Sequence, residues 1–471
     1  MKRILSLILT IALLATFAMS TLVGCGPQKE PPKDFVMPEG GFDTETPIEI
    51  TFYHSMGKNL REVLDASIAD FQLKYPNITV KHESYGDYDG VLSQIKTELT
   101  VGDHPNLAYC YADHVAVYNV SGATQKLDIL MNDATYGYTE EEINNFIEGA
   151  LDEGKTFGDG ATYLVPIAKS TEVLYYNKTF FSEHNISVPT TWTEMKAVCE
   201  QIKAIEGNKC IPLGYDSESN WFITMCEQYG SEYTDGSQDN PFVFNNETNR
   251  NFVEMFREWY TQGLVTTPAL QGGSYTSDLF TGKDKTGTRC YMTIGSTGGA
   301  TYQQPSNTNG KYAFEVGIAP IPKLEGGEAK VISQGPSLCI FKDSDPQKVL
   351  ATWLFFRHLT TDEVFQASVS MSNGYAPVIK SVKDNPVYAD FLAGAETNGT
   401  ENIQAYAAKV ALEQSDAWFV SDAFYGSSVA RTQVGLLMQK CLAIPAGGNI
   451  ESLIQQAFQA AVDECKYQTR R

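Results

Sequence analysis

The order of hydrophobic and polar residues predicts strands and helices that alternate along the first part of the chain. Residues 48–53 and 78–82 alternate apolar and polar side chains, a pattern typical of half-buried strands. Residues 60–75 and 88–100 instead place apolar side chains three and four positions apart, so each segment predicts an amphipathic helix. A further strand is expected at 107–111. Strands that alternate with helices of this length favour right-handed βαβ units and parallel strands.

The later part of the chain continues this mixture and ends in helices. Residues 173–177 predict a strand, and Thr191 begins a helix whose capping box is completed by Glu194. Pro346 occupies the first turn of another predicted helix, where its missing N–H is harmless. Further helices are expected at 252–261, 402–413, 427–442 and 450–465. At roughly 100–200 residues per domain, the 471 residues predict two or three α/β domains.

The N-terminus has the pattern of an export signal. Lys2 and Arg3 precede an apolar run over residues 4–17, and small residues lead to Cys25. The tetrad that ends at Cys25, Leu-Val-Gly-Cys, resembles a bacterial lipobox, so residues 1–24 are expected to be removed and Cys25 to be lipidated. An ordinary cleaved signal with an incidental cysteine is the alternative. The proline-rich residues 25–46 are expected to form an unfolded tether to the outer face of the cytoplasmic membrane.

Composition narrows the classes of partner. The chain carries 57 acidic and 35 basic residues, and its formal net charge of −22 argues against a nucleic-acid partner, because phosphate binding needs a basic surface. After Cys25, eight cysteines remain without any Cys-x-x-Cys pair, so structural zinc is not expected, while disulfides and buried thiols both stay open. The 25 Tyr, 24 Phe and 5 Trp supply enough rings for a sugar-stacking surface as well as a core.

One catalytic pattern is matched, and its surroundings argue against it. Residues 149–156 satisfy the phosphate-binding loop G-x-x-x-x-G-K-[ST], but a predicted helix precedes them where that loop requires a strand. Asp152 and Glu153 would also place negative charge inside the phosphate cradle. The sequence contains neither H-E-x-x-H nor G-x-S-x-G. Nucleotide binding is therefore not expected, whereas a pair of carboxylates for glycoside hydrolysis stays open.

Aromatic and polar residues follow the predicted strands. Tyr53 and His54 end the first strand, Tyr88 comes after the second, and Asp113 comes after the third. Ligands of open α/β sheets bind beyond the carboxyl ends of the strands, so these residues are expected to line one edge of a cleft. Taken singly, each tyrosine is more often a core or surface residue than a ligand contact.

Several segments resemble the extracellular solute-binding proteins of family 1, the maltose-binding-like receptors of ABC importers, and especially the branch of glycerol-3-phosphate receptors. The resemblance covers nearly the whole chain after the signal and rests on 52–56, 86–88, 165–178, 188–192, 292–296, 335–337 and 373–378. It implies an α/β, two-lobed fold of the periplasmic-binding-protein type II, each lobe a mostly parallel sheet flanked by helices, with a hinge between the lobes. Lobe 1 is expected to comprise 47–156 and 288–340, and lobe 2 to comprise 157–287 and 341–471.

The resemblance also implies which residues meet the ligand. Carried over position by position, it places in the cleft Tyr88, Asp113, Ser170, Ser296, Gly335 and Tyr375, with Arg431 as the phosphate-contacting arginine. Two departures weaken phosphate as the ligand, since Asp113 stands where that branch has a glutamate and the residues around Arg431 lack its arginine- and glycine-rich pattern. Trp221 is a candidate platform for stacking a sugar face, and Lys169 is a candidate for an anionic group.

Together these observations predict a lipid-anchored receptor, not an enzyme, that captures an extracellular sugar or polyol and delivers it to the permease subunits of an ABC transporter. A receptor of the same fold for glycerol 3-phosphate or a glycerophosphodiester is the alternative within this class. An extracellular carbohydrate-active enzyme is the main rival from another class, and a surface adhesin is a weaker one. No cofactor, metal or nucleic acid is expected, and the protein is expected to be a monomer.

Overall fold

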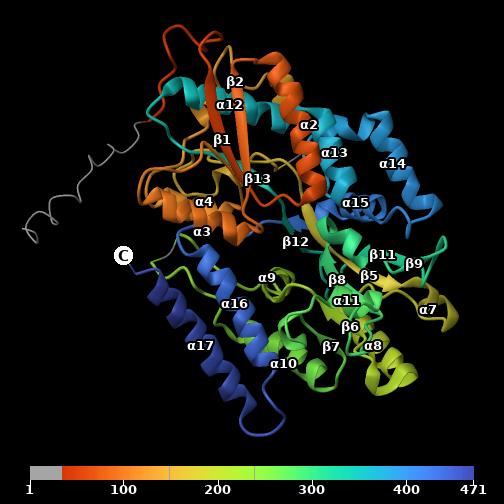
Figure 1. Ribbon diagram of the computed structural model, residues 1–471. Helices are drawn as coiled ribbons and strands as arrows, with labels where there is room; N and C mark the ends of the chain where they lie inside the picture. Colours follow the sequence, from red (N-terminus) through yellow and green to blue (C-terminus); the bar gives the residue numbers. More distant parts are fainter. Residues whose placement is uncertain (1–33, 148, 238, 471) are drawn as a thin grey trace, which may run out of the picture.

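The computed structural model describes residues 34–147, 149–237 and 239–470, which fold into two α/β lobes (Figure 1). Lobe 1 is built on a five-stranded sheet with the strand order β2-β1-β3-β13-β4. Its strands are β1 (Ile48–His54), β2 (Ile78–Ser84), β3 (Leu107–Cys110), β4 (Val165–Pro166) and β13 (Ser337–Ile340). Its helices are α2 (Lys58–Lys74), α3 (Tyr88–Leu99), α4 (Ala112–Asn119), α5 (Asp128–Met131), α6 (Glu140–Asn145), α12 (Pro346–Thr361), α13 (Glu363–Asn373) and α14 (Pro386–Thr397).

Lobe 2 is built on a seven-stranded sheet with the order β14-β12-β5-β8-β6-β7, in which β11 also pairs with β5. Its strands are β5 (Ser170–Asn177), β6 (Leu213–Tyr215), β7 (Val265–Thr266), β8 (Met292–Ser296), β11 (Val316–Pro320), β12 (Val331–Gln334) and β14 (Trp418–Phe419). Its helices are α7 (Lys178–Glu183), α8 (Trp192–Glu206), α9 (Glu218–Gln228), α10 (Glu247–Thr261), α11 (Thr276–Thr281), α15 (Ile403–Glu413), α16 (Ser427–Leu442) and α17 (Ile450–Gln468). A separate ribbon joins β9 (Asn307–Thr308) to β10 (Lys311–Tyr312).

The helix α8 shows how local sequence produces these elements. Its N-cap Thr191 accepts a hydrogen bond from the Glu194 backbone N–H, 3.2 Å away, and the Glu194 side chain accepts one from the Thr191 N–H in return. This capping box satisfies backbone groups that the first turn leaves without partners. Met195, Cys199 and Ile202 then recur at helical spacing, and all three are buried in the lobe 2 core. The predicted helix at this position is confirmed.

Three connections join the lobes, and they define the hinge. The chain crosses between β4 and β5, returns between β12 and β13, and crosses again between α14 and α15. The return connection contains Gly335, where an added Cβ would lie only 2.0 Å from the Ala168 carbonyl oxygen of the neighbouring crossing. Two crossing strands therefore approach more closely at this point than any side chain permits.

The course of the chain through the lobes differs from the expected boundaries. Three strands from 288–340, namely β8, β11 and β12, belong to the lobe 2 sheet, and only β13 joins lobe 1. The helices α12 and α13, expected in lobe 2, pack into the lobe 1 core. Each sheet is mostly parallel, as expected, with one antiparallel strand. In lobe 1 this strand is β13, which runs against β3 and β4, and in lobe 2 it is β5, which runs against β8, β11 and β12. The two-lobed fold itself is confirmed.

The expected tether is folded at its C-terminal end. Phe35 and Phe42 are buried in the lobe 1 core, and the Asp43 backbone N–H donates to Gln347 Oε1 at 2.9 Å. Two phenylalanines bury enough apolar surface to hold a short segment against the lobe, which the proline count alone concealed. The predicted signal 1–24 and the lipidation site Cys25 lie outside the described residues.

The eight cysteines that follow Cys25 are all buried free thiols, the second of the two possibilities left open by the sequence. They are distributed over the cores of both lobes, where a thiol packs as a small apolar group. Within the described part of the chain, no helix combines the length and apolar character that crossing a membrane requires.

Candidate ligand-binding site

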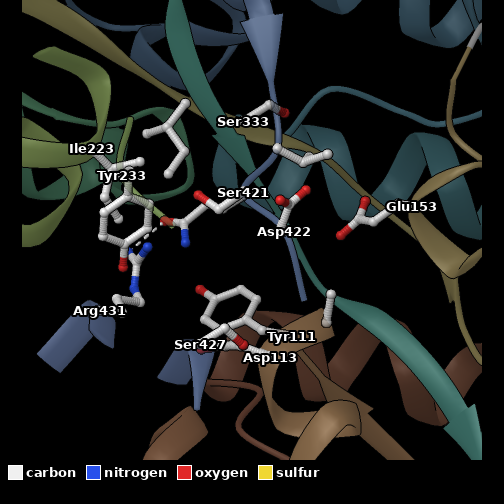
Figure 2. A pocket seen from close by; sticks show the side chains of 14 residues that line it. Tyr111, Asp113, Glu153, Ile223, Tyr233, Ser333, Ser421, Asp422, Ser427 and Arg431 are labelled. Carbon is white, nitrogen blue, oxygen red and sulfur yellow. Dashed lines mark hydrogen bonds between the residues drawn. The ribbon is translucent and has the colours of Figure 1, made fainter. Parts of the chain in front are cut away.

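A pocket of about 510 Å³, including solvent space at its mouth, lies between the two lobes (Figure 2). Lobe 1 contributes Tyr111, Ala112, Asp113 and Glu153, and lobe 2 contributes Ile223, Tyr233, Ile332, Ser333, Gln334, Val420, Ser421, Asp422, Ser427 and Arg431. Because both lobes supply side chains, a molecule bound here contacts both at once. That is the arrangement in which ligand binding couples to hinge closure.

Strand ends and helix starts position the polar side chains of the pocket. Tyr111 is the N-cap of α4, directly after β3, and Asp113 lies in the first turn of that helix. Gln334 is the last residue of β12, immediately before the return crossing. Arg431 lies in the second turn of α16, the lobe 2 helix that contacts α4 across the pocket. The site therefore assembles where the carboxyl end of β3 meets the opposite lobe.

Arg431 is the principal cation of the lobe 2 wall. Its Nη2 donates to Asn220 Oδ1 and to Gln334 Oε1, the latter at 3.0 Å. Both acceptors are neutral amides, and none of the ion pairs among the described residues includes Arg431. Its guanidinium therefore keeps a full positive charge without a directly paired carboxylate.

Two hydroxyl groups near Arg431 are available to a ligand. Figure 2 shows the Tyr233 ring beside Arg431, with Ser421 on the same wall. The hydroxyl oxygens of Tyr233 and Ser421 are both buried and have no hydrogen-bond partner among the described residues. Buried polar atoms in folded proteins are nearly always hydrogen-bonded, so these two atoms are suited to a bound polar molecule.

Carboxylates dominate the remainder of the pocket. Glu153 forms a buried ion pair with Lys169, whose side chain lies at the crossing that leads into β5. Burial raises the pKa of Asp422, and the nearby Asp235 carboxylate raises it further. With Asp113 as the third acidic residue, three carboxylates face the charges of Arg431 and Lys169.

Stacked tyrosine rings support the lobe 1 wall. The Tyr88 ring stacks on Tyr111, with centroids 4.0 Å apart and planes at 16°, and on Tyr109, with centroids 5.3 Å apart. Tyr375 adds a further phenol close to Tyr88 at this cluster. Such packing fixes the orientation of Tyr111, the ring that reaches the pocket.

Of the ten residues that the sequence predicts as ligand contacts, two line the pocket and two more lie behind its lobe 1 wall. Asp113 and Arg431 line the pocket directly, and Tyr88 with Tyr375 lies behind Tyr111. Three others lie along the hinge. Ser170 Oγ donates to the Gln334 carbonyl at 3.1 Å, Gly335 forms the return crossing, and Ser296 ends β8 and caps the following turn through the Gly298 N–H.

Three predicted contacts lie away from the pocket. His54 and Trp221 are completely buried, His54 in lobe 1 and Trp221 in the lobe 2 core, where its ring stacks on Tyr215 with centroids 4.8 Å apart. Tyr53 packs against Tyr85 and donates to Glu98 Oε1 at 3.2 Å. Tyr53 and His54 point to the two faces of β1, and Trp221 lies on the buried face of α9. All three side chains therefore pack within a lobe, away from the pocket.

Sequence reasoning missed four pocket residues of lobe 2, three of which lie in loops. Tyr233, Ser421, Asp422 and Gln334 all line the pocket, yet none follows a strong strand pattern. Tyr233 and Asp422 come from irregular segments whose course depends on packing between α9, α10 and α16. A pattern of hydrophobic positions carries no information about where such loops run. The candidate Lys169 proves to be the partner of Glu153.

Comparisons with known proteins agree with this architecture. The sequence profile described as "Bacterial extracellular solute-binding protein" matches residues 66–393. The sn-glycerol-3-phosphate-binding periplasmic protein UgpB of Shigella dysenteriae is 24% identical over 349 residues, which cover 71% of this chain and 75% of UgpB. UgpB of Mycobacterium tuberculosis, solved with glycerophosphocholine, superposes with a TM-score of 0.71 at 20% identity and covers 90% of this chain and 100% of its own.

A sugar receptor shows the same fold. GacH of Streptomyces glaucescens, solved unliganded and with acarbose, has a TM-score of 0.68 at 17% identity and covers 90% of this chain and 99% of its own. At this level of identity, both solved structures establish the fold. The profile match spans more than half of the sequence, and the protein therefore belongs to the bacterial extracellular solute-binding protein family.

Proposed function

We propose that the protein is the substrate-binding component of an ABC importer, and that it captures a sugar or polyol in the interlobe pocket. The observation that carries this proposal is the pocket itself, which collects hydrogen-bonding side chains from both lobes in a member of a solute-binding family. Closure around the solute would then create the surface that the permease recognises. A structural neighbour solved with acarbose and a relative named for glycerol-3-phosphate binding support the class of solute.

The lining suits a neutral polyhydroxylated molecule. Carboxylates such as Asp113 and Asp422 accept hydrogen bonds from hydroxyl groups, and Gln334 offers an amide group. Tyr111 and Tyr233 offer apolar ring faces, on which the C–H face of a sugar packs. Pockets for small solutes combine these two kinds of surface, because ring faces supply buried area and a few polar groups fix orientation.

A glycerophosphate is the second candidate, and Arg431 favours it. An arginine without a paired carboxylate is well matched to a phosphate, which it binds through two parallel hydrogen bonds. The acidic groups Asp113, Glu153 and Asp422 work against a doubly charged phosphate monoester in the same volume. We therefore place neutral sugars first and singly charged phosphodiesters second.

The test is a thermal-shift screen of the purified protein against sugars, polyols and glycerophosphates, followed by calorimetry on each hit. A solute that binds only the folded state raises the melting temperature, and Asp113→Asn and Arg431→Ala should each weaken binding by about tenfold or more. Arg250→Ala is the matched control, since Arg250 bonds to Asn245 away from the pocket. A screen without any hit would contradict the proposal, as would conversion of the solute into product.

We also propose that Cys25 anchors the protein to the membrane through a lipid, as its lipobox-like tetrad predicts. Retention by the cell would keep the receptor near its permease. Fractionation of cells that express the wild type or Cys25→Ser tests this step. The wild type should sediment with membranes and the variant should be released, whereas identical fractionation of the two would overturn the lipid anchor.

A further inference from the structure

Behind the pocket, a buried carboxyl group is joined to Arg431 through one amide. Glu172 lies in β5 with 2% of its surface exposed, and Tyr215 Oη donates to Glu172 Oε2 at 2.5 Å. The Asn220 side chain lies close enough to Glu172 to lower the pKa of its carboxyl group, and Asn220 Oδ1 accepts from Arg431 Nη2. Glu172 itself does not line the pocket, so it touches no ligand directly.

The chemistry of the amide fixes its orientation. Arg431 can only donate, so the Asn220 oxygen must face Arg431 and the Asn220 nitrogen must face Glu172. In this orientation, Asn220 accepts from the guanidinium while its N–H groups are directed towards the carboxyl group. A change in the charge of Glu172 therefore acts on the group that holds Arg431 in place.

Few other charges surround Glu172. Tyr215 from β6 bonds to it, Asn220 from α9 lies beside it, and Arg431 from α16 is the cation that acts on it. Asp216, which follows β6, is the nearby like charge, and it accepts from Thr276 Oγ1 at 2.7 Å. Burial raises the pKa of Glu172 to about 7, against the opposing effects of Tyr215, Asn220 and Arg431. Its charge thus changes within the range that an extracellular protein meets.

We propose that Glu172 is a positioning residue for Arg431. Through Asn220, the charge state of Glu172 decides whether Arg431 favours a neutral or an anionic solute. This inference rests on the proposed function. When Glu172 is ionised, it offsets the charge of Arg431, and the pocket favours neutral polyhydroxylated solutes. When Glu172 is protonated, the charge of Arg431 is left for the ligand, and the pocket favours a singly charged anion.

Linkage gives this inference a signature that a purely structural role would lack. An anion beside Arg431 opposes the ionised form of Glu172, so anion binding must draw a proton onto the protein near neutral pH. A neutral sugar adds no charge and should bind without net proton uptake. Asp113 and Asp422 also face the pocket. If their carboxyl groups caused the pH dependence of anion binding, that dependence would persist when Glu172 is replaced.

Calorimetry at pH 6 and pH 8 tests the inference, with maltose as the neutral probe and glycerophosphoglycerol as the anionic probe. A phosphodiester keeps its single charge over this range, so any pH dependence belongs to the protein. The wild type should bind the diester roughly fivefold or more tightly at pH 6 than at pH 8, whereas maltose binding should be constant. Glu172→Gln should bind the diester equally at both pH values, at the affinity of the wild type at pH 6.

The control is Glu315→Gln, which removes an exposed carboxylate from the Lys178 pair on the same lobe and should behave as the wild type. Proton uptake is measured on the wild type alone, by comparing the heats of diester binding in two buffers of different ionisation enthalpy. This measurement tests the inference even if Glu172→Gln does not fold. Maltose binding with no diester binding, diester binding without pH dependence, or an unchanged pH dependence in Glu172→Gln would overturn this inference alone. A thermal-shift screen without any hit among sugars, polyols and glycerophosphates would overturn the proposed function with it.

Discussion

His54 begins a hydrogen-bond chain that runs from the interior of lobe 1 to Asp65 at the surface. The Met56 N–H donates to His54 Nδ1 at 3.1 Å, so the proton of a neutral His54 ring must lie on Nε2. That nitrogen lies 2.8 Å from His82 Nδ1, and His82 Nε2 lies 2.9 Å from Asp65 Oδ1. Burial is the main cause that lowers the pKa of His54 to about 3, with further contributions from His82 and Arg61. Protonation would break the bond from Met56 and place a charge inside the lobe.

The hydrogen-bond chain at His54 predicts that the protein loses stability in acid. The unfolded histidine gains a proton below about pH 6.5 while folded His54 stays neutral, so its contribution is complete above about 6.5 and declines as the pH falls towards 3. The slope from this one proton is at most about 1.4 kcal/mol per pH unit. His54→Asn keeps an acceptor for Met56 without a titrating ring, and its stability should fall less steeply in acid than that of the wild type.

Urea unfolding followed by tryptophan fluorescence at pH 7.5, 6 and 5 measures the difference between the two proteins. His114 and His358 also have lowered pKa values, and they contribute equally to wild type and variant. The matched control is His184→Asn, because His184 lies exposed on lobe 2. Parallel pH profiles for wild type and His54→Asn would refute the prediction.

At the residue scale, two of the predicted ligand contacts line the interlobe pocket. Asp113 follows β3 and Arg431 was carried over by resemblance, and both line the pocket. His54 and Trp221 were misplaced because a residue near the end of a strand or helix can still point into the core. Whether it does so depends on twist and on the neighbouring element, which no single-chain pattern records.

At the element scale, the buried pair of Glu153 and Lys169 joins two segments at the hinge. Glu153 lies in a short 3-10 helix of lobe 1, and Lys169 precedes β5 at the crossing, with side chains 9% and 6% exposed. This is the segment that matches the phosphate-binding loop, and its 3-10 turn and ion pair show why the match is incidental. Breaking such a pair leaves an uncompensated charge in the interior.

Lys169→Met should therefore lower the free energy of unfolding by about 3–5 kcal/mol, and Glu153→Gln added to it should restore most of the loss. Lys155→Met is the control from the same segment, because Lys155 pairs with Asp152 at the surface, 3.3 Å apart, and should cost under about 1 kcal/mol. Denaturant unfolding of the four proteins gives the comparison. A Lys169→Met loss no larger than that of Lys155→Met would count against this role.

Element positions were far more predictable than the lobe to which each element belongs. Long amphipathic helices such as α2 and α16 and the strand β1 lie where periodicity placed them, because one buried face dictates their pattern. Short strands such as β7 and β14 carry too few residues to show a period. The crossing after β12 decides that β13 joins lobe 1, and only the close backbone approach at Gly335 marks that point.

At the scale of the whole molecule, the chain alternates between lobes through three connections, so a rigid rotation about the hinge moves the two sheets as units. In the present structure, α4 and α16 touch across the pocket, so both lobes already face the same small volume. A solute can shift this equilibrium only by its extra affinity for the closed form. The contacts that supply such affinity are those made from both sides at once, such as Asp113 from lobe 1 and Arg431 from lobe 2.

Small-angle scattering should therefore show a smaller radius of gyration when a solute identified by thermal shift is added at saturation. The wild type should become more compact, because binding to both walls favours closure over the open form. A variant that combines Asp113→Asn with Arg431→Ala removes one contact from each wall and should keep the open dimensions at the same solute concentration. Glu315→Gln, altered only on the lobe 2 surface, should compact as the wild type does. Identical curves with and without a bound solute would show that the pocket holds its ligand without moving the lobes, and closure would then have no part in delivery.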